Sequence, residues 1–424
     1  MRCIIKQRIK QESKNCVLNF SNMNKHHILQ EFIEKHKHLP KQGSEEWLAQ
    51  RKFTVGGSQI ATIMGINKYE NIKGFVKTKM DMYTFKKGAP LWFGTLMEYG
   101  VQQYVEIEFK TKLFETGSLP CDFNKYISYS PDGLCIISND SLKKIINKKQ
   151  LENIYETSVI EEHVKCDKKE MIVLMEFKSP FMRKIVQGEM PDYYKPQPLL
   201  GMEVINIAEM SIFIECVFRF CSFKDLYNNK YSYYHFDKER YNKDAIMYSA
   251  ISLFYKESDK DHEGIRFILD NIEEFKNSQY GGRYKEGDLS SISDRNIINK
   301  ILELSKECLD VEYHSMYSNR KEDYENENNY TFHIFNNPIK FVKEVKKIRE
   351  VKSSEYVYLG TLCYKLLEIN QIPMFKEKIL TDELNSKIEK VFEIVKNVTE
   401  ESKDIKDPAE FEKYWKSAKI PTKI

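Results

Sequence analysis

The 424-residue sequence has no apolar run near the ~18 residues that a membrane-spanning helix needs. Its longest apolar stretch, residues 210–220, is interrupted by Glu215 and Arg219. The opening segment, residues 1–10, is too highly charged to form a secretory signal peptide. The sequence therefore predicts a soluble protein that works inside a cell and has no membrane partner.

The nine cysteines are scattered, and no two of them form a Cys-x-x-Cys pair. An odd number without framework spacing indicates reduced thiols rather than a disulfide scaffold. The four cysteines that an iron–sulfur nuclease needs around its core are not found either. The histidines lack regular ligand spacing and there is no Gly-x-Ser-x-Gly motif, so a histidine-based hydrolase finds no support.

The sequence also has little net charge, because 66 Lys and Arg residues face 63 Asp and Glu residues, leaving +3 at pH 7. Overall charge therefore does not identify a nucleic-acid-binding protein, and any such surface must be a local basic patch. Hydrophobic residues make up 41% of the chain, which is enough for a packed core. At this length we expect a core domain with added segments.

The expected elements follow the strand–helix–strand order that is typical of an α/β fold. Strands are expected near residues 126–129, 172–178 and 210–220, and helices at 28–34, 45–52, 55–64, 91–110, 142–155, 193–204 and 382–401. We divide the chain into an N-terminal appendage (1–42), a core (43–275) with an insertion at about 138–170, and a C-terminal accessory region (276–424).

One expected apolar strand ends with Glu176, Phe177 and Lys178. Because strand side chains alternate between faces, Glu176 and Lys178 point to one face and Phe177 points to the other. A carboxylate and an ammonium group on an apolar strand are costly unless they have a role. A tight turn of sequence Ser-Pro-Asp-Gly adds a second carboxylate, Asp132, upstream. This order of residues indicates a magnesium-dependent nuclease.

Two carboxylates at a strand end suit Mg²⁺, which prefers oxygen ligands and keeps several bound waters. The ion lowers the pKa of a bound water and stabilises charge on the phosphorus centre and leaving oxygen. Lys178 would orient or deprotonate the attacking water, and Glu98 on the expected helix 91–110 is a third carboxylate. Alone, Asp-Gly usually forms a turn and Glu-x-Lys an exposed strand pair, but their order and apolar surroundings favour the functional interpretation.

A phosphate-binding site is also predicted. The Gly-Gly-Ser segment that ends at Ser58 opens a helix, whose free N–H groups and dipole attract an anion. Arg51 adds a planar two-pronged donor, Ser130 adds a further hydroxyl, and Lys68 would contribute more loosely. The alternative is a serine cap on a surface helix with Arg51 in solvent.

Five motifs occur in a fixed order along the chain. They are Gly-Ser-Glu-Glu-Trp at 43–47 with Arg51, Val-Gly-Gly-Ser at 55–58, Phe-Gly at 93–94 with Glu98, Ser-Pro-Asp-Gly at 130–133 and Glu-Phe-Lys at 176–178. Across about residues 43–215, their order and local spacing resemble the YqaJ-type viral recombinase family of PD-(D/E)XK nucleases, which includes phage lambda exonuclease. The Asn-, Lys- and Ile-rich composition with large insertions resembles a homologue from a large DNA virus, acting in host cytoplasm or a viral factory.

The resemblance implies a restriction-endonuclease-like α/β core, with a mixed central sheet flanked by helices, an insertion and a C-terminal α-rich extension. It implies an exonuclease that degrades linear double-stranded DNA from 5′ ends with Mg²⁺, or with Mn²⁺ in its place. The 3′ single strands left behind would pass to a single-strand annealing protein. The predicted phosphate site would hold the 5′-phosphate.

The resemblance also assigns roles to individual residues. By motif position, Asp132, Glu176 and Glu98 would be the metal ligands. Lys178 would be the catalytic lysine and Gln197 an active-site glutamine.

Some features depart from the family pattern. The family commonly has two glutamines in this helix, whereas this chain has Gln197 alone between two prolines. Because proline disrupts a helix interior, we expect the helix to begin at Pro198. The separation of 44 residues between Asp132 and Glu176, and the long C-terminal region, have no counterpart in the compact phage enzyme, so the oligomeric state is left open.

Two alternatives stay open from the sequence. One is a structure-selective or alkaline-type endonuclease of the same superfamily, which would also cut covalently closed circles. The other is a non-catalytic DNA-end-binding protein. Retention of Asp132, Glu176 and Lys178 together argues against the latter, because an inactive site has no reason to bury three charges.

Overall fold

The computed structural model describes residues 24–81, 88–145, 169–221, 246–277, 289, 295–304, 308–317, 347, 350 and 355–424. Most of the insertion expected at 138–170, with most of the helix expected at 142–155, lies outside these residues. No helix in the described part of the chain combines the length and the apolar character that a membrane crossing needs.

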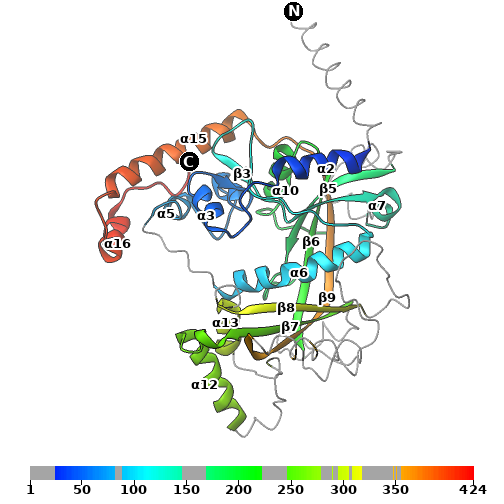
Figure 1. The fold of residues 1–424 in the computed structure, drawn as a ribbon. Helices are drawn as coiled ribbons and strands as arrows, with labels where there is room; N and C mark the ends of the chain where they lie inside the picture. The colour runs from blue at the N-terminus through cyan, green and yellow to red at the C-terminus, as the bar shows by residue number, and fades with distance from the viewer. Residues whose placement is uncertain are drawn as a thin grey trace, which may run out of the picture.

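The centre of the fold is a six-stranded mixed sheet in the order β4-β5-β6-β9-β7-β8. Its strands are β4 (Gly133–Ser138), β5 (Glu170–Lys178), β6 (Met210–Cys221), β7 (Met247–Lys256), β8 (Asp310–Tyr317) and β9 (Tyr356–Phe375). β5 and β6 are parallel, and the other neighbouring pairs are antiparallel. The long strands β6 and β9 run side by side through the molecule (Figure 1).

β9 lies inside this sheet although it comes from the segment that we expected to be an accessory region. It pairs with β6 along one edge and with β7 along the other. The sheet therefore combines strands from segments 43–275 and 276–424, and position 275 does not mark a boundary within it.

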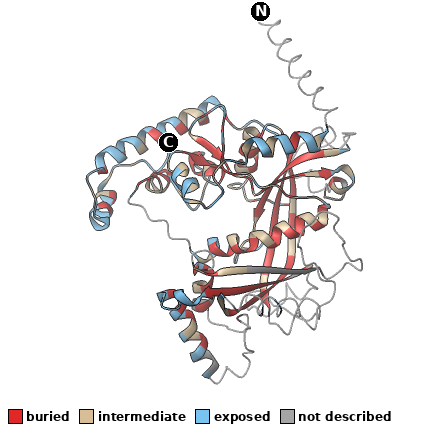
Figure 2. Ribbon diagram, viewed as in Figure 1, coloured by how far each residue is buried: buried red, intermediate tan, exposed pale blue. Residues whose placement is uncertain are grey.

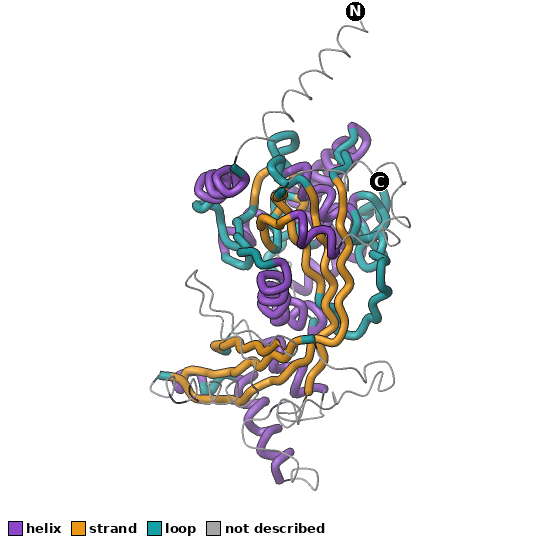
Figure 3. Tube along the Cα trace, turned by 90° about the vertical axis from the view of Figure 1, so that its right-hand side faces the viewer, coloured by secondary structure: helices purple, strands orange, loops and turns teal. Residues whose placement is uncertain are grey.

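Helices cover both faces of the sheet. α6 (Ala89–Phe109) packs on one face, whereas α10 (Pro196–Val204) and α2 (Lys25–His36) pack on the other. In Figure 3, α6 is seen nearly end-on beside the long central strands, on one side of the sheet. The result is a layered α/β fold, as the order of elements in the sequence predicts.

β5 shows how the sequence specifies these layers. Val173 and Met175 belong to the apolar cluster that includes α6, and the alternate residues Ile172 and Leu174 belong to the cluster that includes α10. Each of these side chains is almost completely buried, which stabilises the fold by roughly 1.5–3 kcal/mol per side chain. Figure 2 shows the same burial along the central strands, whereas the outer face of α2 is exposed and that of α6 is partly buried.

A further apolar cluster lies beside the sheet and includes the two C-terminal helices, α15 (Asp382–Ser402) and α16 (Pro408–Ser417). They pack near α4 and α5, and Lys77 Nζ contacts Glu412 Oε1 at 2.6 Å. The elements around this cluster are β1 (Val55–Gly56), η1 (Gly57–Gln59), α4 (Ile60–Ile63), α5 (Ile72–Lys77), β2 (Leu119–Pro120) and β3 (Ile127–Tyr129). The C-terminal segment therefore supports the elements that carry the Gly-Gly-Ser motif.

The remaining described helices are α3 (Glu45–Arg51), α7 (Asn139–Ile145), η2 (Glu257–Asp259), α12 (Glu263–Asn277) and α13 (Arg295–Leu304). The capped start expected for α3 is confirmed, because the Ser44 hydroxyl accepts a hydrogen bond from the Trp47 amide at 3.2 Å. The expected start of α10 at Pro198 is wrong, since the helix begins at Pro196. Both prolines fit there because the first turn of a helix leaves its N–H groups unused.

Candidate active site

The end of β5 carries a buried ion pair. Glu176 is fully buried, and its Oε1 atom accepts a hydrogen bond from the Lys178 ammonium group. Lys178 also donates to the backbone oxygen of Phe177 at 3.0 Å. Phe177 itself packs in the apolar cluster of α6. The alternation expected from the sequence is therefore confirmed.

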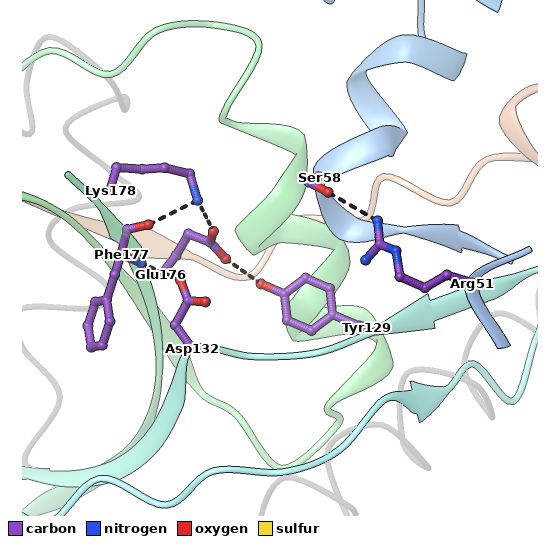
Figure 4. A network of polar contacts seen from close by, with 7 residues as sticks. All are labelled: Arg51, Ser58, Tyr129, Asp132, Glu176, Phe177 and Lys178. Carbon is purple, nitrogen blue, oxygen red and sulfur yellow. Dashed lines mark hydrogen bonds and ion pairs between the residues drawn. The ribbon is translucent and has the colours of Figure 1, made fainter. Parts of the chain in front are cut away.

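Asp132 meets this pair because it directly precedes β4, which is antiparallel to β5. Its Oδ2 atom accepts a hydrogen bond from the Phe177 amide at 2.6 Å (Figure 4). Burial, followed by the charges of Glu176 and Glu98, raises the pKa of Asp132 well above its ordinary value, although the Lys178 charge opposes this. The site therefore concentrates negative charge that a bound cation would stabilise.

Lys178 holds its proton in this arrangement. Burial lowers the pKa of Lys178, but the charges of Glu176 and Asp132 outweigh burial and raise it above its ordinary value. The side chain is thus an ammonium group that supplies a positive charge and donates hydrogen bonds. A role in deprotonating water stays a prediction, since it requires that a cation first offset both carboxylates.

Tyr129 connects this centre to the rest of the site. It lies at the end of β3, almost fully buried, and its hydroxyl donates to Glu176 Oε2 at 2.9 Å. Its ring packs against Gly57 of η1 and Gly201 of α10, where an added Cβ would lie 2.5 Å from a ring carbon. Real Cβ atoms do not approach so closely, so both positions require glycine for the ring to fit.

The residues at the end of β5 supply oxygen atoms that suit a divalent ion. Among the described residues, no group of three or more His, Cys, Asp or Glu side chains is close enough to hold a metal by itself. Asp132 and Glu176 nevertheless offer two carboxylates, and Phe177 adds a nearby carbonyl oxygen. Such hard oxygen donors fit Mg²⁺, which completes its coordination with water.

The predicted phosphate site is formed by α3 and η1. Arg51 Nη2 lies 3.5 Å from Ser58 Oγ. Both residues lie on the side of Tyr129 away from Glu176 (Figure 4). An added Cβ on Gly56 would lie 2.7 Å from Arg51 Nη1, so the bare backbone lets the guanidinium group approach. Burial lowers the pKa of Arg51 to about 10, which leaves it cationic at neutral pH.

Trp47 connects Ser130, the third residue predicted for this site, to Arg51. The Arg51 guanidinium carbon lies 4.6 Å from the centre of the Trp47 ring, within the range of a cation–π contact. The Trp47 indole nitrogen donates to Ser130 Oγ at 2.9 Å. Trp47 therefore connects Ser130 to Arg51, which in turn contacts Ser58.

The buried side chain of Lys79 binds the backbone next to this site. Lys79 donates to the carbonyl oxygens of Arg51 and Thr54, each at 2.7 Å, and to Gln59 Oε1 at 3.1 Å. Burial, with the charge of Arg51, lowers the pKa of Lys79 to about 7, although Glu70 opposes this. Lys79 thus connects the end of α3 to η1 through three acceptors.

The other predicted residues occupy different places. Glu98, on α6, is near enough that its charge contributes to the raised pKa of Asp132. Gln197 lies at the start of α10, and its Cγ would be 3.3 Å from an added Cβ on Gly57. Lys68 lies over the ring of Tyr193, with its Nζ atom 5.0 Å from the ring centre.

Sequence reasoning missed Tyr129, Trp47 and Lys79 as parts of the site. Tyr129 and Trp47 stand inside or beside the motifs, so their proximity to Asp132 and Arg51 was the available signal. Lys79 lies in a segment without a motif, and its burial depends on tertiary contacts. No sequence pattern indicates it.

Residues 46–207 match the model of the YqaJ-like viral recombinase domain. A protein of African swine fever virus is 32% identical over 208 residues in a tick isolate from Malawi and 29% identical over 209 residues in the Badajoz strain. These alignments cover 47% of this chain, and the chain spans 56% and 57% of the length of the two relatives.

Solved structures give a weaker likeness. The alkaline exonuclease LHK-Exo of Laribacter hongkongensis and its complex with dAMP are 19% and 18% identical, with TM-scores of 0.28 and 0.29. They cover 41% of this chain and 74% and 73% of their own chains. Both curated relatives are viral, in agreement with the expected viral homologue. The matched segment contains four of the five predicted motifs in full, and residues 46–207 are therefore similar to the YqaJ-like viral recombinase domain.

Proposed function

We propose that this protein is a Mg²⁺-dependent deoxyribonuclease of the PD-(D/E)XK type that degrades linear double-stranded DNA from 5′ ends. The observation that carries the proposal is that the Tyr129 side chain contacts both Glu176 and Gly57. Its hydroxyl binds Glu176 at the carboxylate centre, and its ring packs on Gly57 in the phosphate site. This contact supports the proposal because it would hold the proposed phosphate-binding site at a fixed separation from the carboxylate pair.

In this proposal, Asp132 and Glu176 would hold the ion, with Glu98 adding negative charge nearby. The ion, when bound, supplies an activated water and stabilises charge on the phosphate that is cleaved. Lys178 would place its ammonium group beside the scissile phosphate and orient the attacking water by hydrogen bonding. Gln197, at the start of α10, would help to position the strand between the two parts of the site.

Arg51 and Ser58, with Ser130, would bind a terminal 5′-phosphate monoester. A guanidinium group binds such a group through paired charge-assisted hydrogen bonds. A site for a chain end next to the cleavage centre favours stepwise removal from that end over cleavage inside a duplex. The 3′ single strand that results would be the ligand of an annealing partner.

The test compares three DNA molecules with purified full-length protein, in Mg²⁺ and in chelator. They are a 5′-phosphorylated linear duplex labelled at its 5′ end, the same duplex labelled at its 3′ end, and a covalently closed circle. We expect Mg²⁺-dependent early release of the 5′ label as a short product, late release of the 3′ label and an intact circle. Cleavage of the circle would instead indicate an endonuclease, and no cleavage of any substrate would contradict the proposal.

A further inference from the structure

A row of tyrosine rings leads from the protein surface to Lys178. Tyr69 is 72% exposed and meets Tyr193 edge-to-face, with ring centres 5.5 Å apart. Tyr193 and Tyr194 have ring centres 4.4 Å apart, and the Tyr194 ring centre is 5.4 Å from Lys178 Nζ. The outermost ring is therefore connected to the proposed reaction centre by direct aromatic contacts.

Cationic side chains accompany this row. Lys68 Nζ lies 4.9 Å from the ring centre of Tyr69 and 5.0 Å from that of Tyr193. The Arg183 guanidinium carbon lies 5.9 Å from the ring centre of Tyr194. Aromatic faces alternating with cations are the surface that single-stranded nucleic acids use, because bases stack on rings and phosphates meet positive charge.

Hydrogen bonds fix the loop that carries the exposed Tyr69 ring. The Tyr69 amide donates to Asn67 Oδ1 at 2.9 Å, and Asn67 Nδ2 donates to Thr62 Oγ1 at 2.8 Å. Thr62 is buried in α4 and donates in turn to Glu70 Oε2 at 3.1 Å. Holding an exposed aromatic ring in this way adds little to the core, but it prepares a rigid contact surface.

The segment that carries Tyr193 is held as firmly. Arg183 pairs with Glu215, which is buried in β6. Asn370 of β9 accepts from the Gly188 amide at 2.9 Å and donates to the Glu189 carbonyl oxygen at 2.8 Å. Both partners of the edge-to-face pair are thus positioned by contacts to the folded core.

We propose that Tyr69, backed by Tyr193, stacks an unpaired base of the DNA substrate while Lys68 contacts the adjoining phosphate. This inference rests on the proposed nuclease function. A strand can enter a centre as buried as Glu176 only if its terminal bases leave the duplex, which costs stacking and pairing energy. A base stacked on Tyr69 offsets part of that cost and keeps the strand open.

The experiment measures coupling between Tyr69 and individual bases. Fluorescence anisotropy in chelator gives the dissociation constants of full-length protein for duplexes that carry one abasic position among the first three nucleotides of either strand. Tyr69→Ala is compared with Tyr69→Trp, which keeps a stacking face, and with Phe123→Ala, which removes another aromatic ring that is 72% exposed.

Tyr69→Ala should weaken binding of the intact duplex about tenfold, and Tyr69→Trp and Phe123→Ala should change it less than about twofold. When the abasic position replaces the base that stacks on Tyr69, Tyr69→Ala should cause no further loss of binding affinity. Equal losses at every position, or no loss on the intact duplex, would overturn the inference. If the protein cleaves DNA but the effect of Tyr69→Ala is the same at every abasic position, only the stacking site is contradicted. If the effect disappears at one abasic position but no Mg²⁺-dependent cleavage occurs, only the nuclease function is contradicted.

Discussion

Tyr129 donates its hydroxyl hydrogen to Oε2 of Glu176 at 2.9 Å, and both side chains are buried. The same tyrosine ring packs against Gly57 and Gly201. Because aromatic rings are rigid, the carboxylate centre and the phosphate site cannot move apart without displacing Tyr129. The distance between a held 5′-phosphate and the cleaved bond would follow from this contact.

Tyr129→Phe should remove this link while keeping the ring. Glu176 then loses a donor in a buried environment, so we expect the free energy of unfolding to fall by about 2 kcal/mol. The Mg²⁺ concentration for half-maximal cleavage should also change. Urea unfolding and Mg²⁺ titration of cleavage test this, with Tyr126→Phe as the control, because Tyr126 uses its ring to stack on Phe392. Equal behaviour of the two variants would show that the Tyr129 hydroxyl has no special role.

Lys178→Ala should separate binding from cleavage. The variant keeps Asp132 and Glu176 but loses the positive charge beside them, so we expect cleavage to fall by at least about 100-fold. Affinity for a duplex end, measured in chelator, should stay within about threefold because the phosphate site is untouched. Lys184→Ala, a nearby exposed lysine, provides the control. Full activity of Lys178→Ala would refute the assigned role.

Arg51→Ala should affect one kind of DNA end. Loss of charge-assisted hydrogen bonds to a phosphate costs about 1.5–3 kcal/mol, or roughly 10- to 100-fold in kcat/KM on 5′-phosphorylated ends. On 5′-hydroxyl ends the change should be small. The neighbouring Lys52, which pairs with Asp81 at 2.6 Å on the surface, gives the matched control Lys52→Ala. A loss of the same size on both ends would exclude a phosphate site at Arg51.

Lys79 should leave a signature in the pH dependence of stability. Its folded pKa is lowered from 10.5 to about 7, so between these values the unfolded chain binds more protons than the folded one. The free energy of unfolding must then rise with pH across this window, by up to about 1.4 kcal/mol per pH unit from this group.

Lys79→Met should remove that contribution, because methionine has no titratable group. Urea unfolding of both proteins at about pH 7.5, 8.5 and 9.5, all between the two pKa values, gives the slope of the free energy of unfolding against pH. The wild-type slope should exceed that of Lys79→Met. Parallel slopes would mean that Lys79 keeps its proton throughout.

The parts of the site that local sequence could predict are those with local causes. Alternation along one strand fixes the faces of Glu176 and Phe177, and the Ser44 cap fixes the start of α3. Asp132 could be placed near the end of β5 only because its turn and that strand belong to one ordered set of motifs.

The remaining parts depend on contacts between distant segments. Trp47 bonds to Ser130, and Lys79 bonds to carbonyl groups near α3, and neither contact has a periodic signal. Lys68 was expected at the phosphate site, whereas its nearest aromatic partners are Tyr69 and Tyr193. Sheet order is also non-local, which is why β9 could be assigned to an accessory region although it pairs with β6.

The central claim, that Asp132 and Glu176 share one divalent ion, is tested most directly by metal binding without DNA. Electron paramagnetic resonance of free Mn²⁺ during titration counts the bound ions in wild type, Asp132→Asn and Glu176→Gln, with Asp122→Asn as an exposed control. We predict one bound ion for the wild type and for Asp122→Asn, and none for the other two. Wild-type binding by both Asp132→Asn and Glu176→Gln would contradict the claim.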